Sequence, residues 1–222
     1  MLCAVLVVAV LRSGYFDLAH IDVTGNQAVA EAEIVAASGL SLGSSLLRVS
    51  RARVAAGLLG LPRIKRAEVH RQWPRGVAIA IEERTSMLVV PVGQSWLEVA
   101  TDGVVVALVD GERPGGLPTL EGLATETAAV GEKLPGPAAA AVVVATGAVA
   151  AAGEEVAVIR LDPSGIEVEL ADETLLFLGA PGTDIEVRVE VAVAMLAELR
   201  AAGRPVAYID VRTPGQPVVR PK

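Results

Sequence analysis

Few residues of this sequence have types and spacing that could support catalysis. The stretch Gly39-Leu40-Ser41-Leu42-Gly43 matches the G-x-S-x-G pattern of hydrolase nucleophile elbows. That mechanism needs a buried strand before the serine and a helix after it, whereas the pattern here predicts a helix before Ser41 and a loop after it. His70 is the only downstream histidine, with Glu68 as the sole acid between it and Ser41. We therefore interpret the stretch as a loop with two flexible glycines, and keep a secreted serine hydrolase as the weakest alternative.

Other candidate catalytic or ligand-binding groups also fail on spacing. Glu82-Glu83 are adjacent on a predicted strand and point to opposite faces, so they cannot flank one substrate. Gly131-Glu132-Lys133 lacks the glycine and the hydroxyl residue of a phosphate loop. One cysteine, Cys3, excludes an internal disulfide, and His20 and His70 lie too far apart to suggest a zinc site. The aromatics are too few for nucleic-acid stacking. The sequence predicts no enzyme, no cofactor, no metal site, no small-molecule substrate and no nucleic-acid partner.

A strand near the C-terminus is the better candidate, because it could act through contact. Tyr208-Ile209-Asp210-Val211-Arg212 is followed by Thr213-Pro214-Gly215. A C-terminal strand is often an edge, where unpaired backbone groups can accept a strand from another chain. Arg212 and Pro214 could equally blunt such an edge. The pattern leaves both interpretations open.

Charge is unevenly distributed along the 222 residues, whose net charge is −7. Residues 48–84 hold nine Arg or Lys against three Glu, a balance of +6, and the rest of the chain carries −13. Such a basic stripe can bind anionic lipid or acidic protein, or it can be a solvated face.

The elements that must position these groups begin with the stretch Leu61–Arg84, which predicts a strand, a tight turn and a second strand. Val77, Ile79 and Ile81 alternate at a period of two, and Pro74 favours the reversal. Upstream, the patterns predict a strand at 20–24 and helices at 30–38 and 51–59. This order, strand, helix, helix, strand, strand, predicts a small α+β domain with two helices on one face of its sheet.

The pattern of the residues after 85 predicts a second, β-rich domain with a mostly antiparallel sheet and two packing helices. The expected strands are 87–92, 96–100, 104–109, 156–161, 166–170, 174–178 and 206–212, with an extended segment at 117–122. The expected helices are 137–152 and one that Thr183-Asp184-Ile185-Glu186 opens as a capping box. We expect Val206–Arg212 to be the last strand and the tail at 214–222 to be loose.

The apolar run Met1–Leu11 is shorter than the roughly 20 residues that cross a bilayer. It could be part of a membrane helix, with Arg12 and Tyr15 as interfacial anchors, or a signal peptide that lacks a charged n-region. The domains expected are a truncated transmembrane segment at 1–15, the α+β domain at 16–85, the β domain at 86–213 and a flexible tail at 214–222.

Several short motifs, each weak alone, together resemble the FtsQ/DivIB family of cell-division proteins, and they cover residues 16 to 215 in the family's order. They are Ile21-x-Val23-x-Gly25-Asn26, Gly43 with Leu46-Leu47, Leu61-Pro62, Ala67-x-Val69, Trp73-Pro74, Ile81-x-Glu83-Arg84, Asp102-Gly103, Leu117-Pro118-x-Leu120-x-Gly122 and Tyr208-Ile209-Asp210-Val211-Arg212. The resemblance implies a POTRA domain followed by an FtsQ-type β domain.

The resemblance also implies a function. It implies a non-enzymatic, single-pass membrane scaffold at the division septum, with a cytoplasmic N-terminus, that binds FtsB and FtsL and controls the septal peptidoglycan synthase complex. The partner-binding residues that it implies are Tyr208, Ile209, Asp210, Val211, Arg212, Thr213 and Gly215. The recruitment surface that it implies is basic and comprises Arg63, Lys65, Arg66, Arg71 and Arg75. A POTRA-bearing transport or secretion component is the alternative, although the chain has no room for the further strands of an outer-membrane barrel.

Overall fold

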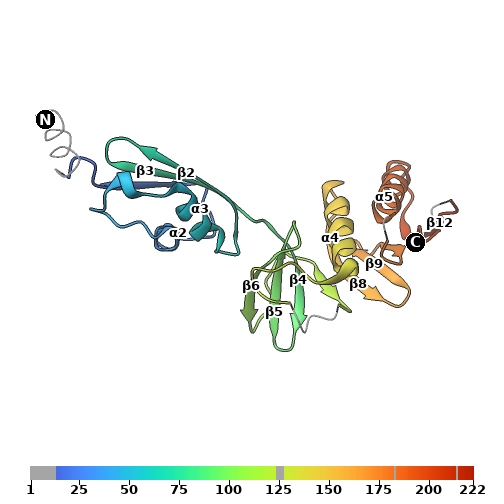
Figure 1. The fold of residues 1–222 in the computed structure, drawn as a ribbon. Helices are drawn as coiled ribbons and strands as arrows, with labels where there is room; N and C mark the ends of the chain where they lie inside the picture. Colours follow the sequence, from blue (N-terminus) through green and yellow to red (C-terminus); the bar gives the residue numbers. More distant parts are fainter. Residues whose placement is uncertain (1–13, 124–127, 183, 214) are drawn as a thin grey trace, which may run out of the picture. The chain divides into compact units, whose positions relative to one another are not determined.

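A computed structural model describes residues 14–123, 128–182, 184–213 and 215–222. The chain divides into two compact units that meet between Arg84 and Thr85, and each is described by itself (Figure 1). None of the helices within the described ranges is long and apolar enough to cross a membrane.

The first unit has the predicted order of strand, helix, helix, strand and strand. Its elements are β1 (His20–Thr24), α2 (Glu31–Ser38), the 3₁₀ turn η1 (Leu46–Arg48), α3 (Arg51–Leu59), β2 (Ile64–Gln72) and β3 (Gly76–Glu83). The sheet order is β1-β3-β2, with β1 parallel and β2 antiparallel to β3. The predicted hairpin and both helices are therefore confirmed, and so is the α+β class of this unit.

Local signals position the two helices of this unit. Gly39 ends α2 with a φ of 65°, in the left-handed region that suits glycine. The Ser50 hydroxyl accepts a hydrogen bond from the N–H of Arg53 and so caps α3. Leu58 of α3 and Ile34 of α2 are fully buried with Ile79 of β3, so both helices pack on one face of the sheet.

The second unit is built on one sheet of nine strands. They are β4 (Ser86–Val92), β5 (Ser95–Ala100), β6 (Val105–Asp110), β7 (Thr119–Glu121), β8 (Val156–Asp162), β9 (Gly165–Leu170), β10 (Leu175–Gly179), β11 (Val206–Asp210) and β12 (Val218–Pro221). The order across the sheet is β12-β11-β10-β9-β8-β7-β4-β5-β6. Three neighbouring pairs are parallel, β10 with β11, β4 with β7 and β7 with β8, and the others are antiparallel. The predicted mostly antiparallel sheet is confirmed.

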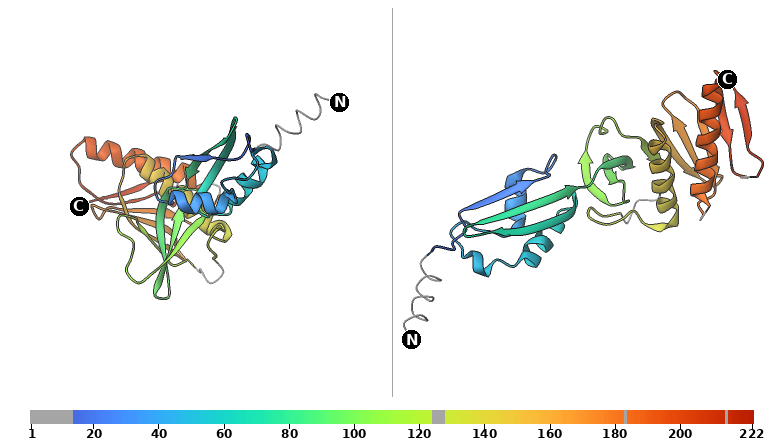
Figure 2. Two further views of the ribbon diagram at one scale, coloured as in Figure 1. Left: turned by 90° about the vertical axis from the view of Figure 1, so that its left-hand side faces the viewer. Right: turned by 90° about the horizontal axis from the view of Figure 1, so that it is seen from above.

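Two helices, α4 (Gly136–Ala151) and α5 (Ile185–Ala201), lie on one face of the β7 to β12 half of this sheet (Figures 1 and 2). Val142 and Val149 of α4 and Val189 and Leu196 of α5 are buried against Ile209 and the other inward side chains of the strands. The predicted stripe along α5 is thus the face that meets the sheet. The capping box of α5 depends on Thr183, which lies outside the described residues.

The C-terminal residues differ from the expectation. Val206–Arg212 was predicted to be the last strand and an edge, but β11 is shorter and lies between β10 and β12. Residues 214–222 were predicted to be loose, yet Val218–Pro221 pair antiparallel with β11. The sequence signal is weak because the strand has only four residues and lies between prolines, whereas its backbone hydrogen bonds to β11 are a long-range gain.

Candidate functional site at the C-terminal edge of the sheet

The second sheet ends in two edge strands, β12 and β6. The start of β6 is covered, because Val105 exchanges backbone hydrogen bonds with Gly131 and Glu132, and a bridge joins Val104 to Lys133. No described residue pairs with the outer side of β12. The outer side of β12 is therefore the more open backbone edge of this unit.

The β12 edge is short and bounded by proline. Its pairs with β11 run from Asp210 opposite Val218 to Val206 opposite Pro221. Pro221 has no backbone N–H, and proline and charged side chains such as that of Arg220 are among the means by which natural edge strands limit uncontrolled pairing. A visiting strand could thus pair with only the few residues between Pro217 and Pro221.

The structure separates the predicted partner-binding residues into two groups. Ile209 and Val211 are fully buried on the helix-covered face. Tyr208 is half-buried on the opposite, helix-free face of the sheet, where its ring meets Phe177 edge to face with centroids 5.6 Å apart. Thr213 and Gly215 are exposed in the connection to β12. Because β11 is flanked on both sides, these residues can offer side chains to a partner but no free strand edge.

Arg212 is held in place at the end of this face. Its guanidinium donates to both carboxylate oxygens of Asp210, with the Nη2–Oδ2 distance at 2.6 Å, and its Cζ lies 5.7 Å from the centre of the Phe177 ring. The hydrogen bonds from Arg212 lower the pKa of Asp210, and Asp210 in turn raises the pKa of Arg212. The result is a fixed cation at the rim of an aromatic patch.

Gly179 allows the chain to pass closely beneath Arg212. Its φ is +80°, and a Cβ built there would lie 3.0 Å from the Cγ of Arg212 and 3.0 Å from Nη1 of Arg188. The pairing of β10 with β9 also shifts register between Phe177 and Gly179. A larger residue would displace the arginine that borders the site.

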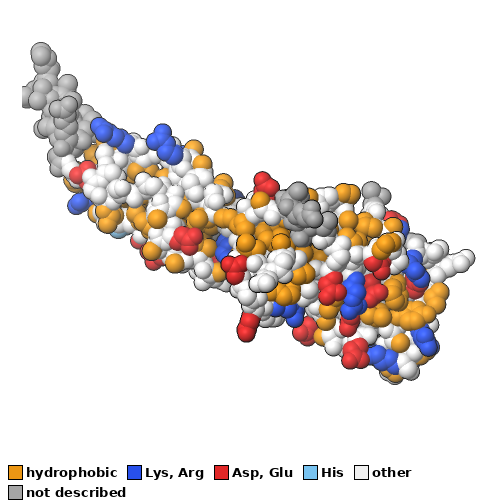
Figure 3. All heavy atoms as spheres, turned by 90° about the horizontal axis from the view of Figure 1, so that it is seen from below, with side chains coloured by type: hydrophobic (Ala, Val, Ile, Leu, Met, Phe, Trp, Pro, Cys, Tyr) orange, Lys and Arg blue, Asp and Glu red, His pale blue; other side chains and the backbone are white. Residues whose placement is uncertain are grey.

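A charged cluster borders the same helix-free face farther along the sheet. Arg160 donates to Glu167 and Glu169 at 2.7 and 2.6 Å and lies 3.6 Å from Glu121. The hydrogen bonds from Glu169 and Glu167 raise the pKa of Arg160. Seen from below, this unit shows basic and acidic side chains close together with hydrophobic side chains among them (Figure 3). The helix-free face therefore combines the aromatic pair of Phe177 and Tyr208 with the ion pairs of Arg160 and Arg212.

The predicted recruitment residues of the first unit lie on or beside the β2–β3 hairpin, and several contact their own chain. Lys65 pairs with Glu82 at 2.8 Å and Arg66 pairs with Glu68 at 2.7 Å. Two of these arginines donate to backbone carbonyls, Arg71 Nη2 to Val49 at 2.5 Å and Arg75 Nε to Asp17 at 3.2 Å. Arg63 acts electrostatically on Glu83. Their charges are thus partly offset.

The remaining sequence motifs lie within the described ranges, and their surroundings differ from those of the sites they resemble. Ser41 lies in the loop between α2 and η1, not at the strand-to-helix turn of a nucleophile elbow. Glu82 and Glu83 diverge, since Glu82 pairs with Lys65 while Glu83 accepts three backbone N–H groups of residues 27–29. Within the described ranges, His, Cys, Asp and Glu side chains form no cluster able to hold a metal.

Sequence reasoning missed two features of these surfaces. One is β12, for which Val218-Val219 between two prolines was the only available signal. The other is the packing of Phe16 on Trp73, which joins residues 57 positions apart and has no periodic signal.

Comparison with known proteins gives one consistent family. Residues 16–84 match the family described as "POTRA domain, FtsQ-type", and residues 89–212 match "Cell division protein FtsQ/DivIB, C-terminal". The chain is 28% identical over 211 residues to "Cell division protein FtsQ" of Streptomyces griseus, covering 93% of this chain and 98% of the relative. It is 29% identical over 214 residues to the Caulobacter vibrioides protein of that name, covering 95% and 66%. The match to the Streptomyces coelicolor protein is 34% over 110 residues, 49% of this chain and 41% of the relative, so the chain matches about two fifths of that relative's length.

Proposed function

This chain belongs to the FtsQ/DivIB family of cell-division proteins, and we propose that it is a non-enzymatic, single-pass scaffold of the bacterial divisome. Its N-terminus lies in the cytoplasm and the bulk of the chain outside the membrane, at the division septum. The scaffold binds FtsB- and FtsL-type partners, and through them it controls the septal peptidoglycan synthase complex.

The observation that carries this proposal is the open outer edge of β12. A partner segment adds there as a strand, because the edge supplies backbone groups that would otherwise face water. Affinity then comes from a short run of main-chain hydrogen bonds, and selectivity from the side chains of the segment. The family resemblance implies a contact on residues 208–213 and Gly215. We propose that its backbone part lies one strand outward, at Val218–Pro221, because β12 covers the outer side of β11.

The side chains of β11 can still contact a partner strand that pairs with β12. Tyr208, Asp210 and Arg212 lie on the helix-free face next to β12, where Tyr208 pairs with Arg220 and Asp210 with Val218 in register. A strand added to β12 would bring its own side chains near this row. A partner with an acidic residue could therefore reach Arg212 or Arg220, while Thr213 and Gly215 border the entry to the edge.

Proline substitution on β12 tests the proposal. In a strand, the N–H groups of alternate residues point to the same side, so Val219→Pro and the pair Val218→Pro with Arg220→Pro remove donors on opposite sides. One of these variants must disturb β11 and the other must disturb only the outer edge. We expect the variant that keeps its melting temperature to lose at least about tenfold in affinity for the extracytoplasmic parts of an FtsB–FtsL pair.

The matched control is Leu108→Lys on β6, the other edge strand, where the side chain is 52% exposed. It should leave affinity unchanged. If the variant that keeps its melting temperature binds as the wild type does, strand addition at β12 is wrong.

The transport alternative has less support. A POTRA region alone would be compatible with a secretion component, but the match over residues 89–212 is to the cell-division family. We therefore favour division over transport. A strain depleted of the protein that divides normally but fails to export proteins would reverse this choice.

A further inference from the structure

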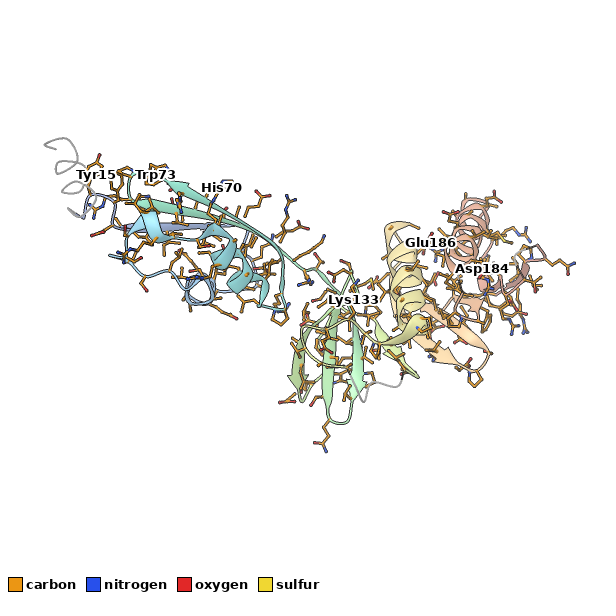
Figure 4. The ribbon with its side chains drawn as sticks, in the orientation of Figure 1. Tyr15, His70, Trp73, Lys133, Asp184 and Glu186 are labelled. Carbon is orange, nitrogen blue, oxygen red and sulfur yellow. The ribbon has the colours of Figure 1, made fainter. Side chains whose placement is uncertain are left out.

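The hairpin tip of the first unit carries an aromatic cluster that faces solvent. Phe16 stacks edge to face with Tyr15 at 5.1 Å and with Trp73 at 5.7 Å between ring centres. Tyr15 is 58% and Trp73 55% exposed. Figure 4 shows both at the same end of the unit. An edge-to-face cluster of this kind usually forms in a core or an interface, since large aromatic surface in water is unfavourable.

Exposed leucines occur in the loop next to the aromatic segment. Five large hydrophobic side chains of the described part of this unit are exposed, Tyr15, Leu42, Leu47, Leu59 and Trp73. The loop that carries Leu42 and Leu47 lies beside the aromatic segment, because its backbone hydrogen-bonds to Phe16 and Leu18. Single exposed leucines are ordinary, but a grouped apolar patch with a polar rim marks an interaction site.

The rim of this patch is cationic. The guanidinium of Arg71 lies 5.9 Å from the centre of the Trp73 ring. Arg75 follows Pro74 and uses only Nε in its contact with the carbonyl of Asp17. Asp17, which directly follows Phe16 in the sequence, is an acidic residue at this end of the unit. Arg75 is exposed and has further N–H donors that could reach an anion outside the protein, whereas Arg71 is half-buried with its Nε enclosed.

We propose that this aromatic end, Tyr15, Phe16, Leu47, Trp73, Arg71 and Arg75, rests in the headgroup layer of an anionic lipid bilayer. Tyrosine and tryptophan favour that layer because it accepts an apolar ring and a polar tip together, and arginine binds lipid phosphates there. The occupant follows from the sequence, since only three residues separate Tyr15 from the apolar run Met1–Leu11. The inference rests on the membrane anchoring proposed above.

The consequence is an orientation for the first unit at the membrane. A single anchor would leave that unit free to swing, whereas a second contact on the hairpin tip fixes which end faces the lipid. The opposite end, where β2 begins, then points away from the bilayer.

Tryptophan fluorescence of the full chain in vesicles tests this contact, because the chain has two tryptophans, Trp73 and Trp96. In the Trp96→Phe variant, Trp73 is the only reporter. In vesicles of phosphatidylcholine and phosphatidylglycerol with brominated acyl chains, we expect Trp73 emission to shift to the blue and to fall at least about twofold. The Trp73→Phe variant reports Trp96 of the second unit and should not respond.

Further variants separate attraction from mere nearness to the anchor. The double variant Tyr15→Ser with Leu47→Ser should reduce the quenching of Trp73. The control Leu59→Ser, which changes the exposed leucine at the end of α3, should not. Arg75→Glu should reduce quenching in vesicles with phosphatidylglycerol more than in neutral ones. The lipid contact alone is overturned if the chain associates with vesicles but the emission of Trp73 stays that of a residue in water. It is also overturned if Tyr15→Ser with Leu47→Ser leaves the quenching of Trp73 unchanged. A chain that does not associate with vesicles overturns both this contact and the anchor.

Discussion

The guanidinium of Arg212 donates to both carboxylate oxygens of Asp210, at the end of β11. The two side chains are unequally exposed, 52% for Arg212 and 18% for Asp210. The pair therefore fixes Asp210 to the sheet while part of the arginine stays open to a partner.

Asp210→Asn should weaken this arrangement without unfolding the unit. Because the arginine is half exposed, we expect a loss of less than about 1 kcal/mol in the free energy of unfolding. The lowered pKa of Asp210 means that this stabilisation is present above its ordinary pKa of about 3.9 and is lost as the pH falls through the lowered value. Urea unfolding should show a difference from wild type at neutral pH that vanishes in acid. A difference that grows in acid would contradict the assignment.

Glu83→Gln should destabilise the first unit. The Glu83 carboxylate accepts the N–H groups of Gln27, Ala28 and Val29 at 2.9, 2.9 and 3.0 Å and so ties the end of β3 to the start of α2. Burial alone would raise the pKa of Glu83, but these three donors lower it, so the contribution is present above about pH 4.3 and is lost on acidification. Discounted for solvent screening, the expected loss is about 1–2 kcal/mol.

Adjacent Glu82 provides the control for this measurement. It pairs with Lys65 at the surface, and Glu82→Gln should leave the unfolding transition unchanged. If Glu83→Gln and Glu82→Gln change the free energy of unfolding equally, the three backbone hydrogen bonds to Glu83 make no specific contribution to stability.

Gly179→Ala should disturb the site through crowding as well as backbone strain. The added Cβ meets Arg212 and Arg188 at 3.0 Å and sits at a positive φ. We expect a loss of about 1–3 kcal/mol and weaker partner binding. Gly203→Ala is the control, since its φ is also positive but nothing lies within 4 Å of its Cβ. Calorimetry should rank Gly179→Ala as the more damaging, and the reverse order would exclude crowding at Arg212.

Ile209→Ala and Tyr208→Ala should differ in kind although they are neighbours on β11. Ile209 is fully buried, so its truncation should cost about 2–5 kcal/mol by leaving a cavity. Tyr208 is on the helix-free face, so its truncation should cost less stability but lower affinity for the partner. Thermal melts and co-purification on the same samples separate the two effects. Similar stability losses with unchanged binding would remove Tyr208 from the proposed contact.

Reversing Arg63, Lys65 and Arg66 to Glu tests the proposed recruitment surface. The change removes the pairs of Lys65 with Glu82 and Arg66 with Glu68 and places like charges together. We expect weaker septal localisation of a fluorescent fusion with the second unit still able to bind partners. Unchanged placement at midcell would refute a recruitment role for these residues.

The sequence by itself determined most of the helices and strands, and it was enough to identify the family. The alternation of Val77, Ile79 and Ile81 predicted β3, Ser50 and Gly39 marked helix ends, and the pattern around Ser41 predicted a helix before it and a loop after it, all of which the structure bears out. Each of these signals is local, because periodicity and capping act between residues a few positions apart. Ordered short motifs were likewise enough to identify the family.

Only the tertiary structure decided which strand is the edge and which residues meet. The covering of β11 by β12, the contact of Phe16 with Trp73 and the three N–H groups that meet Glu83 join segments far apart in sequence. Their free energy comes from long-range hydrogen bonds and packing that leave no period in the chain. For that reason β11 and β12 read as a strand and a loose tail in sequence, and become a covered strand and an open edge in the fold.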